Sequence, residues 1–272
     1  MISDTHQFQN STTALITGAS SGIGYALAKV FARHGHNLVL VARDRQRLSQ
    51  LASEVRQEFG VATKVIPADL SVSTSAHDLC DELQQASIKI SLLVNNAGFD
   101  VYGHFCETDL TKELHMIQVN LVSLTQLTKL LLADMRQQRY GRILNLGSTG
   151  SFVPSTLNAV YSATKAYVLS FSEAIAEELQ GSGVTVTVLC PGATKTEFHQ
   201  RASIEDIRLL RFGVMGAATV AEIGYRAMMA GRRVVVPGLY NQVQVLFAGF
   251  LPRGVMVKMA KVMLQRSRRA AA

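Results

Sequence analysis

A glycine-rich turn between a short apolar run and an amphipathic stretch constrains the fold of this 272-residue chain most. Thr13–Thr17 is apolar enough for a buried strand, and a helical pattern runs from Tyr25 to His34. Between them, Gly18–Gly24 has the spacing G-x-x-x-G-x-G, which permits a tight turn and a close backbone approach. The N–H groups at a helix start favour a phosphate. This pattern predicts a strand–turn–helix unit that binds a nucleotide phosphate.

Short Val/Ile/Leu runs alternate with amphipathic stretches along the rest of the chain. This alternation predicts an α/β fold, a Rossmann-type doubly wound parallel sheet of seven strands with helices on both faces. The chain is 48% hydrophobic and has no linker or internal repeat, so it can bury one large core. Strands are expected near residues 13–17, 37–42, 63–67, 91–94, 141–147, 184–190 and 232–236.

Cap residues mark where the helices are expected to begin and end. Short polar side chains accept hydrogen bonds from the first N–H groups of a helix, and glycine adopts the left-handed conformation that ends one. The expected N-caps are Asp44, Ser73 and Asp109, and the expected helix ends are Gly35, Gly60 and Gly183.

Tyr161 and Lys165 lie four residues apart in a stretch with a helical pattern, so they share a helix face. A tyrosine hydroxyl normally titrates near ~10, and a nearby positive charge lowers its pKa. Lys165 is therefore expected to lower the pKa of Tyr161 and to form an acid/base unit with it. Taken alone, the spacing also fits a half-buried aromatic ring beside a solvated amine.

Several motifs, in order along nearly the whole chain, resemble those of the short-chain dehydrogenase/reductase family. Each is common singly, but the ordered set is not expected by chance. Ser148 precedes Tyr161 by the 13 residues that are usual in the family. The matching motifs are TGxxxGIG at Thr17–Gly24, Asp69 with Leu70, NNAG at Asn95–Gly98, Asn120, Ser148, Tyr161 with Lys165, and Pro191-Gly192 followed by Thr196.

The resemblance implies catalytic roles for four residues, Asn120, Ser148, Tyr161 and Lys165. Ser148 would hydrogen-bond the substrate oxygen, and Tyr161 would exchange a proton with it. Lys165 would favour the Tyr161 phenolate and hold the nicotinamide ribose. Asn120 would hold a water in a proton relay through Lys165.

The end of the second expected strand bears on the choice of cofactor. Ala42 stands where the family usually has an acid for the adenosine ribose, and Arg43 follows it. A guanidinium fork suits a 2′-phosphate, so NADP(H) is expected, with Arg45 or Arg47 in support. Alternatively, Arg43 only ends the strand and Asp44 binds the ribose.

The resemblance also implies a row of contacts along a dinucleotide. Asp69 would contact the adenine, Asn96 to Gly98 the adenosine ribose, and the residues after Pro191 the nicotinamide half. Thr194 stands where the family more often has an aliphatic residue. The expected cofactor-binding residues are Gly18, Ser20, Ser21, Gly22, Ile23, Gly24, Arg43, Asp69, Leu70, Asn96, Ala97, Gly98, Tyr161, Lys165, Pro191, Gly192 and Thr196.

These features predict an NADP(H)-dependent oxidoreductase that interconverts a small apolar ketone or aldehyde and its alcohol. The alternatives are a 3-oxoacyl thioester reductase of lipid metabolism and a non-catalytic nucleotide-sensing protein. His104 fits either a substrate entrance or a plain surface loop. Apolar residues expected in the substrate pocket, or else in the core, are Phe99, Tyr102, Phe105, Phe152, Phe198, Leu209, Leu210 and Phe212.

Other sequence features bear on location and partners. Cys80, Cys106 and Cys190 form no CxxC pair, and their odd number without a signal peptide favours reduced thiols in the cytoplasm. The apolar run Val243–Leu251 is far shorter than the ~20 residues of a membrane span. No metal-ligand cluster and no nucleic-acid recognition motif is visible. A homodimer or homotetramer is expected.

We expect three segments: a flexible N-terminal arm over residues 1–12, a dinucleotide-binding and catalytic domain over 13–240, and a basic amphipathic extension over 241–272. The net charge is +7, although no acidic residue follows Glu222. One expected helix face carries Val255, Met259, Val262 and Met263, and the other carries Lys258, Lys261, Gln265 and Arg268. Residues 253–272 therefore fit docking on the fold or a second subunit, or peripheral contact with an anionic membrane surface.

Overall fold

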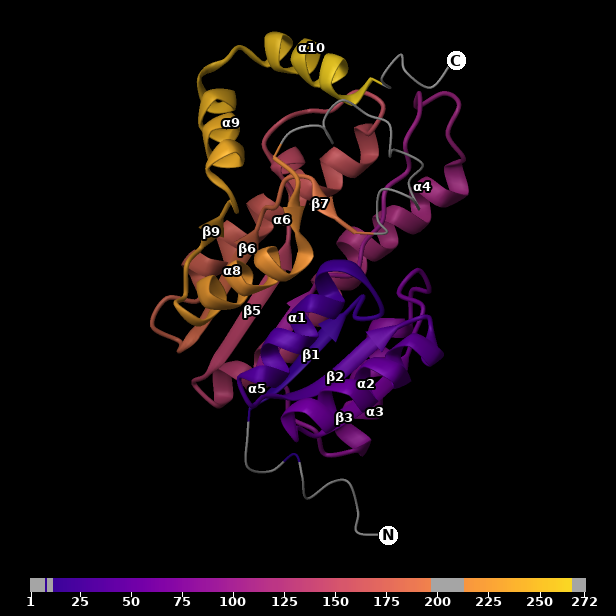
Figure 1. The fold of residues 1–272 in the computed structure, drawn as a ribbon, viewed down its shortest axis with the longest axis vertical. Helices are drawn as coiled ribbons and strands as arrows, with labels where there is room; N and C mark the ends of the chain where they lie inside the picture. Colours follow the sequence, from indigo (N-terminus) through magenta and orange to yellow (C-terminus); the bar gives the residue numbers. More distant parts are fainter. Residues whose placement is uncertain (1–7, 9–11, 197–212, 266–272) are drawn as a thin grey trace.

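Seven parallel strands form a sheet in the order β3-β2-β1-β4-β5-β6-β9 (Figure 1). The computed structural model describes residue 8, residues 12–196 and residues 213–265. The chain runs outward from β1 in one direction and then returns to β4 on its other side, so a topological switch point lies between β1 and β4. The strands are β1 (Thr13–Thr17), β2 (Asn37–Ala42), β3 (Thr63–Pro67), β4 (Leu92–Asn95), β5 (Gly141–Leu146), β6 (Val184–Leu189) and β9 (Val234–Val235).

The predicted seven-stranded Rossmann-type sheet is confirmed. β4 lies one residue later than expected, β5 and β6 each end one residue earlier, and β9 is shorter than predicted, with only Val234–Val235. A second, two-stranded sheet was not predicted. It pairs β7 (Thr194–Lys195) with β8 (Met215–Gly216). Strands of two residues leave no periodic pattern in a sequence, because period-two alternation needs several residues to be recognised. Unlike β9, which lies in the apolar run Val234–Val236, neither β7 nor β8 lies in a Val/Ile/Leu run that could mark it.

Helices cover both faces of the sheet, as predicted. Side chains alternate along β2, so that Leu38 and Leu40 join the core cluster under α1, α2 and α8, while Val39 and Val41 join the cluster under α3 and α5. The helices are α1 (Gly22–Arg33), α2 (Arg45–Phe59), α3 (Ser75–Gln85), α4 (Leu110–Ile117), the π-helical η2 (Gln118–Ser123), α5 (Leu124–Gln137), the short η3 (Thr149–Ser151), α6 (Ala159–Glu178), α8 (Ala217–Met229), α9 (Leu239–Phe250) and α10 (Arg253–Leu264).

Two of the three predicted N-caps are confirmed. Asp44 and Asp109 each accept a hydrogen bond from the backbone N–H three residues on, at the starts of α2 and α4. Ser73 as an N-cap is wrong, because α3 begins after Thr74. The Thr74 hydroxyl donates to the Asp78 carboxylate instead of capping the backbone.

Two of the three predicted helix ends are also confirmed. Gly60 is the left-handed C-cap of α2, and Gly35, with φ +78°, directly follows the last residue of the α1 cap. Gly183 does not end a helix, because α6 stops at Glu178. A Cβ atom at Gly183 would lie 2.0 Å from the carbonyl oxygen of Arg139, so the glycine permits a close backbone contact before β6.

The helical stretch Leu110–Gln137 is, among the described residues, the one long and apolar enough to cross a membrane by length and composition. Leu127, Leu131 and Met135 of this stretch are buried in the core cluster beneath α3 and α5. Packing against the sheet therefore explains part of its apolar character, while Leu110 and Leu114 of the same stretch are exposed.

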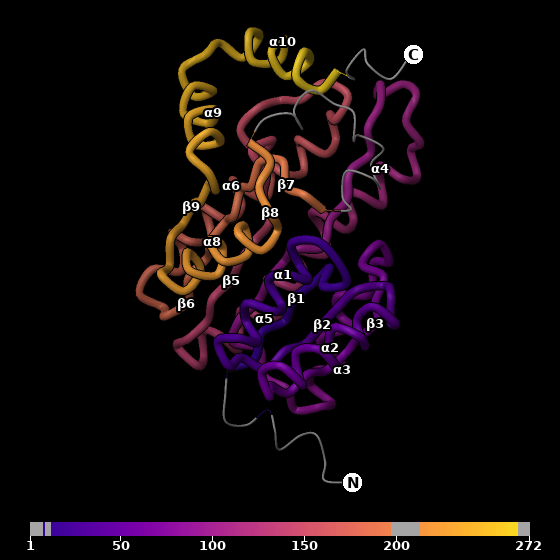
Figure 2. Tube along the Cα trace, in the orientation of Figure 1, coloured from indigo at the N-terminus to yellow at the C-terminus, as the bar shows by residue number. Residues whose placement is uncertain are grey.

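α9 and α10 form an angled pair at the end of the molecule remote from α2 and α3 (Figures 1 and 2). The predicted helix after Pro252 is confirmed as α10. Its predicted apolar face, however, does not pack on the fold, since Val255, Met259 and Val262 are exposed. The buried residues of α10 are instead Met256 and Leu264.

Candidate active site

A cavity of about 840 Å³ lies at the carboxyl ends of the central strands. This is where parallel α/β sheets bind ligands, because the strand order reverses there and the loops diverge. Six loops contribute to its lining, and one residue from each, in chain order, is Gly18, Arg43, Asp69, Asn96, Ser148 and Pro191. Motifs that are far apart in the sequence therefore meet around one space.

The glycine turn after β1 forms one wall of the cavity. Gly18 and Gly22 adopt positive φ values of 66° and 59°. A Cβ atom on Gly18 would lie 2.9 Å from the Cα of Ala97, and one on Gly24 would lie 2.3 Å from the carbonyl oxygen of Gly18. The Ser21 side chain does not cap α1, so the N–H groups of its first turn suit a phosphate.

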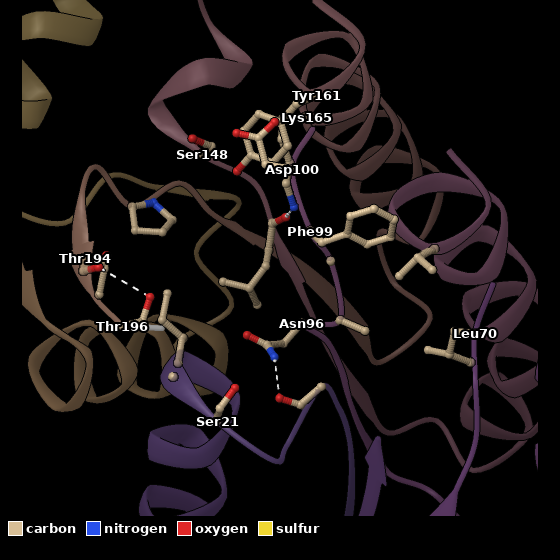
Figure 3. Close-up of a pocket in the computed structure, with 18 of the residues that line it drawn as sticks. Ser21, Leu70, Asn96, Phe99, Asp100, Ser148, Tyr161, Lys165, Thr194 and Thr196 are labelled. Carbon is tan, nitrogen blue, oxygen red and sulfur yellow. Dashed lines mark hydrogen bonds between the residues drawn. The ribbon is translucent and has the colours of Figure 1, made fainter. Parts of the chain in front are cut away.

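Asn96 holds the glycine turn against the loop after β4 (Figure 3). Its side-chain amide donates to the carbonyl oxygens of Thr17 and Gly18, at 2.9 and 3.2 Å. In return, the Thr17 hydroxyl oxygen accepts hydrogen bonds from the backbone N–H groups of Asn96 and Ala97, both at 3.0 Å. The two glycine-containing motifs thus form one rigid cradle.

Basic side chains lie at the end of the cavity next to β2. Arg43 and Arg47 line the cavity, whereas Arg45 does not. Asp44 accepts a hydrogen bond from the backbone of Arg47 at 3.0 Å and forms an ion pair with its side chain at 3.5 Å. The Asp44 carboxylate is therefore engaged in starting α2.

Asp69 and Leu70 complete this end of the cavity. The Asp69 carboxylate accepts hydrogen bonds from the backbone N–H and the hydroxyl of Ser71, at 3.0 and 2.8 Å. Burial opposes its ionisation, but the Ser71 hydrogen bonds and the charge of Arg43 hold the pKa of Asp69 below its usual value. A fixed carboxylate therefore faces the space where the family resemblance predicts that the adenine binds.

Ser148, Tyr161 and Lys165 gather at the opposite end (Figure 3). Ser148 follows β5, and the other two residues lie on the first turns of α6. Ser148 and Tyr161 are hydrogen-bonded through their side chains. The Lys165 ammonium donates to the carbonyl oxygen of Leu146 at 2.7 Å and lies 5.7 Å from the centre of the Tyr161 ring.

The expectation that Lys165 lowers the pKa of Tyr161 is wrong for this structure. Burial raises the pKa of the Tyr161 phenol above its usual value, the charge of Asp100 raises it further, and the Ser148 hydrogen bond works in the opposite direction. Burial also lowers the pKa of Lys165 to about 8, against the attraction of Cys190 and Asp100. Both groups have lost water, which disfavours the charged form of each. Tyr161 is therefore protonated at neutral pH.

Asp100 is a residue of the cavity that the sequence analysis missed. It is only 7% exposed, and its carboxylate accepts a hydrogen bond from the side-chain amide of Asn158, while Oδ1 has no hydrogen-bond partner. Burial raises the pKa of Asp100 to about 7, and the charge of Glu113 raises it further. Hydrogen bonds from the Val101 backbone and from Asn158, together with the charge of Lys165, act in the opposite direction. The sequence signal that could have placed Asp100 in the cavity is its position directly after the NNAG motif and Phe99.

Asn120 lies behind the cavity wall and does not line it. Its amide nitrogen donates to the Phe99 carbonyl oxygen at 3.0 Å and to the Thr164 hydroxyl at 3.2 Å, and its oxygen accepts from the Phe99 N–H at 3.1 Å. It sits in the π-helical η2, and its side chain is buried. A water relay through Asn120 stays a prediction.

The loop after β6 brings Pro191, Gly192 and Thr196 to the cavity, as expected. The hydroxyl of the unusual Thr194 donates to the Gly192 carbonyl oxygen at 3.0 Å, and the Thr196 hydroxyl donates to the Thr194 carbonyl oxygen at 3.4 Å (Figure 3). A buried threonine at this position is therefore satisfied within its own loop.

The expected apolar lining is met only in part. Phe99 lines the cavity, and Leu264 of α10, which the sequence analysis did not single out for this role, joins it. Phe105 is exposed, Phe152 is half-buried and packs against a core cluster, and Tyr102 donates its hydroxyl hydrogen to the Leu264 carbonyl oxygen at 2.7 Å. His104 is exposed and does not line the cavity. Phe198, Leu209, Leu210 and Phe212 lie outside the described residues.

Comparisons with known proteins agree with this geometry. A family model described as short chain dehydrogenase matches residues 12–206. The chain is 30% identical over 230 residues to the ketoacyl reductase HetN of Nostoc sp., a match that covers 85% of this chain and 78% of that protein.

Two solved structures also resemble it over almost their full length. The short-chain dehydrogenase from Sphingobium yanoikuyae in complex with NADPH is 34% identical, with a TM-score of 0.79 and coverage of 96% of this chain and 98% of that one. The bulky-bulky ketone specific alcohol dehydrogenase from Comamonas testosteroni is 31% identical, with a TM-score of 0.75 and coverage of 97% and 98%. Fold, motif order and family match thus agree that the chain belongs to the short-chain dehydrogenase/reductase family of oxidoreductases.

Proposed function

We propose that this protein uses NADP(H) to reduce a ketone or aldehyde to an alcohol, or to catalyse the reverse reaction. The observation that carries the proposal is the hydrogen-bonded pair of Ser148 and Tyr161, with Lys165 buried beside it, at one end of a cavity that has Arg43 and Arg47 at the other. Such a cavity can hold an extended dinucleotide, with one end at Arg43 and Arg47 and the other at Ser148 and Tyr161.

The residues present fit a dinucleotide. Any side chain at Gly18 or Gly24 would strike backbone atoms, so the turn leaves room for a closely held diphosphate. Arg43 and Arg47 supply the positive charge that a 2′-phosphate needs. Asp44 is occupied by the start of α2, which weighs against its binding the ribose hydroxyls in place of Arg43. When bound, the nicotinamide cofactor supplies the hydride.

The protein's own residues handle the proton and the substrate oxygen. The backbone N–H of Gly150 donates to the Ser148 hydroxyl oxygen at 3.0 Å, which fixes that oxygen and leaves its proton to donate. Tyr161 is protonated, as a proton donor to a developing alkoxide must be. Lys165 lies close enough for its charge to favour the phenolate as the proton leaves.

A panel of ketones, aldehydes and alcohols, followed through NADPH absorbance, tests the proposal. We expect saturable turnover with apolar carbonyl compounds and a preference for NADPH over NADH. Binding of NADPH without turnover of any carbonyl or alcohol would instead support a non-catalytic nucleotide sensor.

A 3-oxoacyl thioester reductase remains the second candidate, because the Nostoc relative is named a ketoacyl reductase. The chemistry at Ser148 and Tyr161 would be the same, so the substrate panel must include 3-oxoacyl thioesters with the matching free ketones. A kcat/KM that is much higher for the thioesters would favour this candidate, and equal or lower values would favour the simple carbonyl substrates.

A further inference from the structure

Exposed apolar side chains concentrate on the two C-terminal helices. Among the described residues, fourteen large hydrophobic side chains are exposed, and nine of these lie within residues 239–262. A soluble surface seldom gathers apolar side chains so densely without a partner. The exposed surface of α9 and α10 therefore indicates that another molecule binds there.

On α9 the exposed residues form a stripe. Leu239, Val243, Leu246, Phe247 and Phe250 recur at intervals of three and four residues, so they share one helix face. Leu239 and Phe250 are 76% and 80% exposed. α9 has no extended interface with another described helix or strand.

α9 is fixed to the fold near its start. Asn241 is its buried residue, and its amide donates to the Pro237 carbonyl oxygen at 2.7 Å. A Cβ atom on Gly192 would lie 2.4 Å from the Asn241 side chain, so α9 begins directly against the loop that lines the cavity. The stripe is thus held in place relative to the site.

α10 continues the surface with a second stripe. Val255, Met259 and Val262 are 43 to 55% exposed, while Met256 and Leu264 pack inward. Leu264 lines the cavity and its carbonyl oxygen is held by Tyr102. One face of α10 therefore closes the site and another faces outward.

The charge of this segment selects the kind of occupant. The sequence has no acidic residue after Glu222. Arg253, Lys258 and Lys261 are exposed on α10 next to the apolar stripe. Exposed apolar groups flanked by basic residues match a surface that is apolar beneath a layer of negative charge.

We propose that the apolar faces of α9 and α10, with Arg253, Lys258 and Lys261, bind the surface of an anionic membrane. A second copy of the chain fits this surface less well. A two-fold contact would set the basic residues of one copy near those of the other, with no acid in residues 239–272 to offset them. Anionic lipid headgroups supply the missing charge, and the acyl chains below receive the exposed Leu and Phe side chains.

Sedimentation of the full-length protein with vesicles tests this proposal. The probes are vesicles of phosphatidylcholine alone and of phosphatidylcholine mixed with phosphatidylglycerol. We expect binding to the mixed vesicles at low salt, little binding to the neutral ones, and release as salt rises. Lys258→Gln with Lys261→Gln should weaken binding roughly 30-fold, since each basic residue near such a surface contributes several-fold.

The apolar contribution is tested separately by Phe247→Gln with Phe250→Gln, which changes no charge. We expect this double variant to bind mixed vesicles roughly tenfold more weakly, or weaker still, because two exposed aromatic side chains no longer enter the bilayer. Two matched controls change two basic residues and two large apolar residues outside the segment: Lys89→Gln with Arg136→Gln, and Phe105→Gln with Leu110→Gln, all exposed positions. Neither control should alter binding.

Two results would overturn the proposal. One is equally weak binding of the wild type to both vesicle types at low salt. The other is a fall in molar mass of the Phe247→Gln, Phe250→Gln protein in light scattering without vesicles, which would make this face a subunit interface. Circular dichroism confirms that each variant is folded before it is compared.

Discussion

The ammonium of Lys165 donates a hydrogen bond to the backbone carbonyl oxygen of Leu146, at 2.7 Å. Leu146 ends β5, and Ser148 follows two residues later. This bond therefore ties α6 to the end of β5, so that Tyr161 on the helix meets Ser148 in the loop just after the strand. It also explains in physical terms why a fixed separation between the serine and the tyrosine matters.

Tyr161→Phe should reduce turnover by at least about 10²-fold, because the phenol is the proton donor, and proton transfer by a positioned group contributes this much or more. NADPH binding, measured by fluorescence titration, should stay nearly unchanged. Tyr167→Phe on the same helix is the control, since its hydroxyl pairs with Thr125 at 2.9 Å and does not line the cavity. A Tyr161→Phe protein with most of its activity would refute the assignment.

Arg43→Ala should weaken NADP(H) far more than NAD(H). If the guanidinium holds the 2′-phosphate, the loss is that of a charge-assisted hydrogen bond, about 1.5–3 kcal/mol. The measurement is the Kd of all four dinucleotides by calorimetry. Arg45→Ala removes the same charge two residues on, outside the cavity lining, and should leave the Kd values for NADP(H) and NAD(H) unchanged. An equal loss for both cofactors, or a wild type that prefers NADH, would rule out this role.

Asp100 should make the protein less stable as pH rises from about 4 to about 7. Its pKa is raised from 3.8 to about 7, first by burial, so the folded state retains a proton that the unfolded chain releases over this range. The cost is complete above pH 7 and amounts to a few kcal/mol, at about 1.4 kcal/mol per pKa unit.

Asp100→Asn removes this titration while its amide oxygen can still accept from Asn158. We therefore expect the variant to gain stability over the wild type at pH 8 and little at pH 4, as measured by urea denaturation. The exposed Asp81→Asn is the control and should show no such difference. Parallel stability profiles for Asp100→Asn and the wild type would contradict the prediction.

The sequence predicted the sheet because each of its long strands is a run of apolar residues bounded by turn residues, and these patterns are local. It predicted which motifs surround the cavity because their order matched a family. It missed Asp100 because the proximity of Asp100 to Tyr161 arises from packing of the loop after β4 against α6, which brings together residues that are 61 positions apart in the chain.

The prediction that Lys165 lowers the pKa of Tyr161 was wrong for a related reason. The helical spacing of Tyr161 and Lys165 is visible in the sequence, whereas the loss of water around both groups depends on the closed structure above them. The sequence left open whether the apolar face of α10 packs on the fold, because a helix with apolar residues on several faces does not reveal which of them packs inward.

Gly24→Ala should destabilise the fold and weaken NADPH binding together. The new methyl group would lie 2.3 Å from the Gly18 carbonyl oxygen and 2.4 Å from the Asn96 amide, so the turn that cradles the diphosphate must move. Overpacking of this kind costs about 1–3 kcal/mol.

Gly249→Ala is the matched control, because it lies in α9 and its Cβ atom would meet nothing within 4 Å. Alanine favours a helix over glycine by up to about 1 kcal/mol, so this variant should be as stable as the wild type or slightly more so. Urea midpoints and NADPH titrations of the two variants check both expectations. If Gly24→Ala kept both its midpoint and its NADPH affinity, the turn would have room for a side chain, and the close approach of Gly24 to Gly18 would not be what shapes the cofactor site.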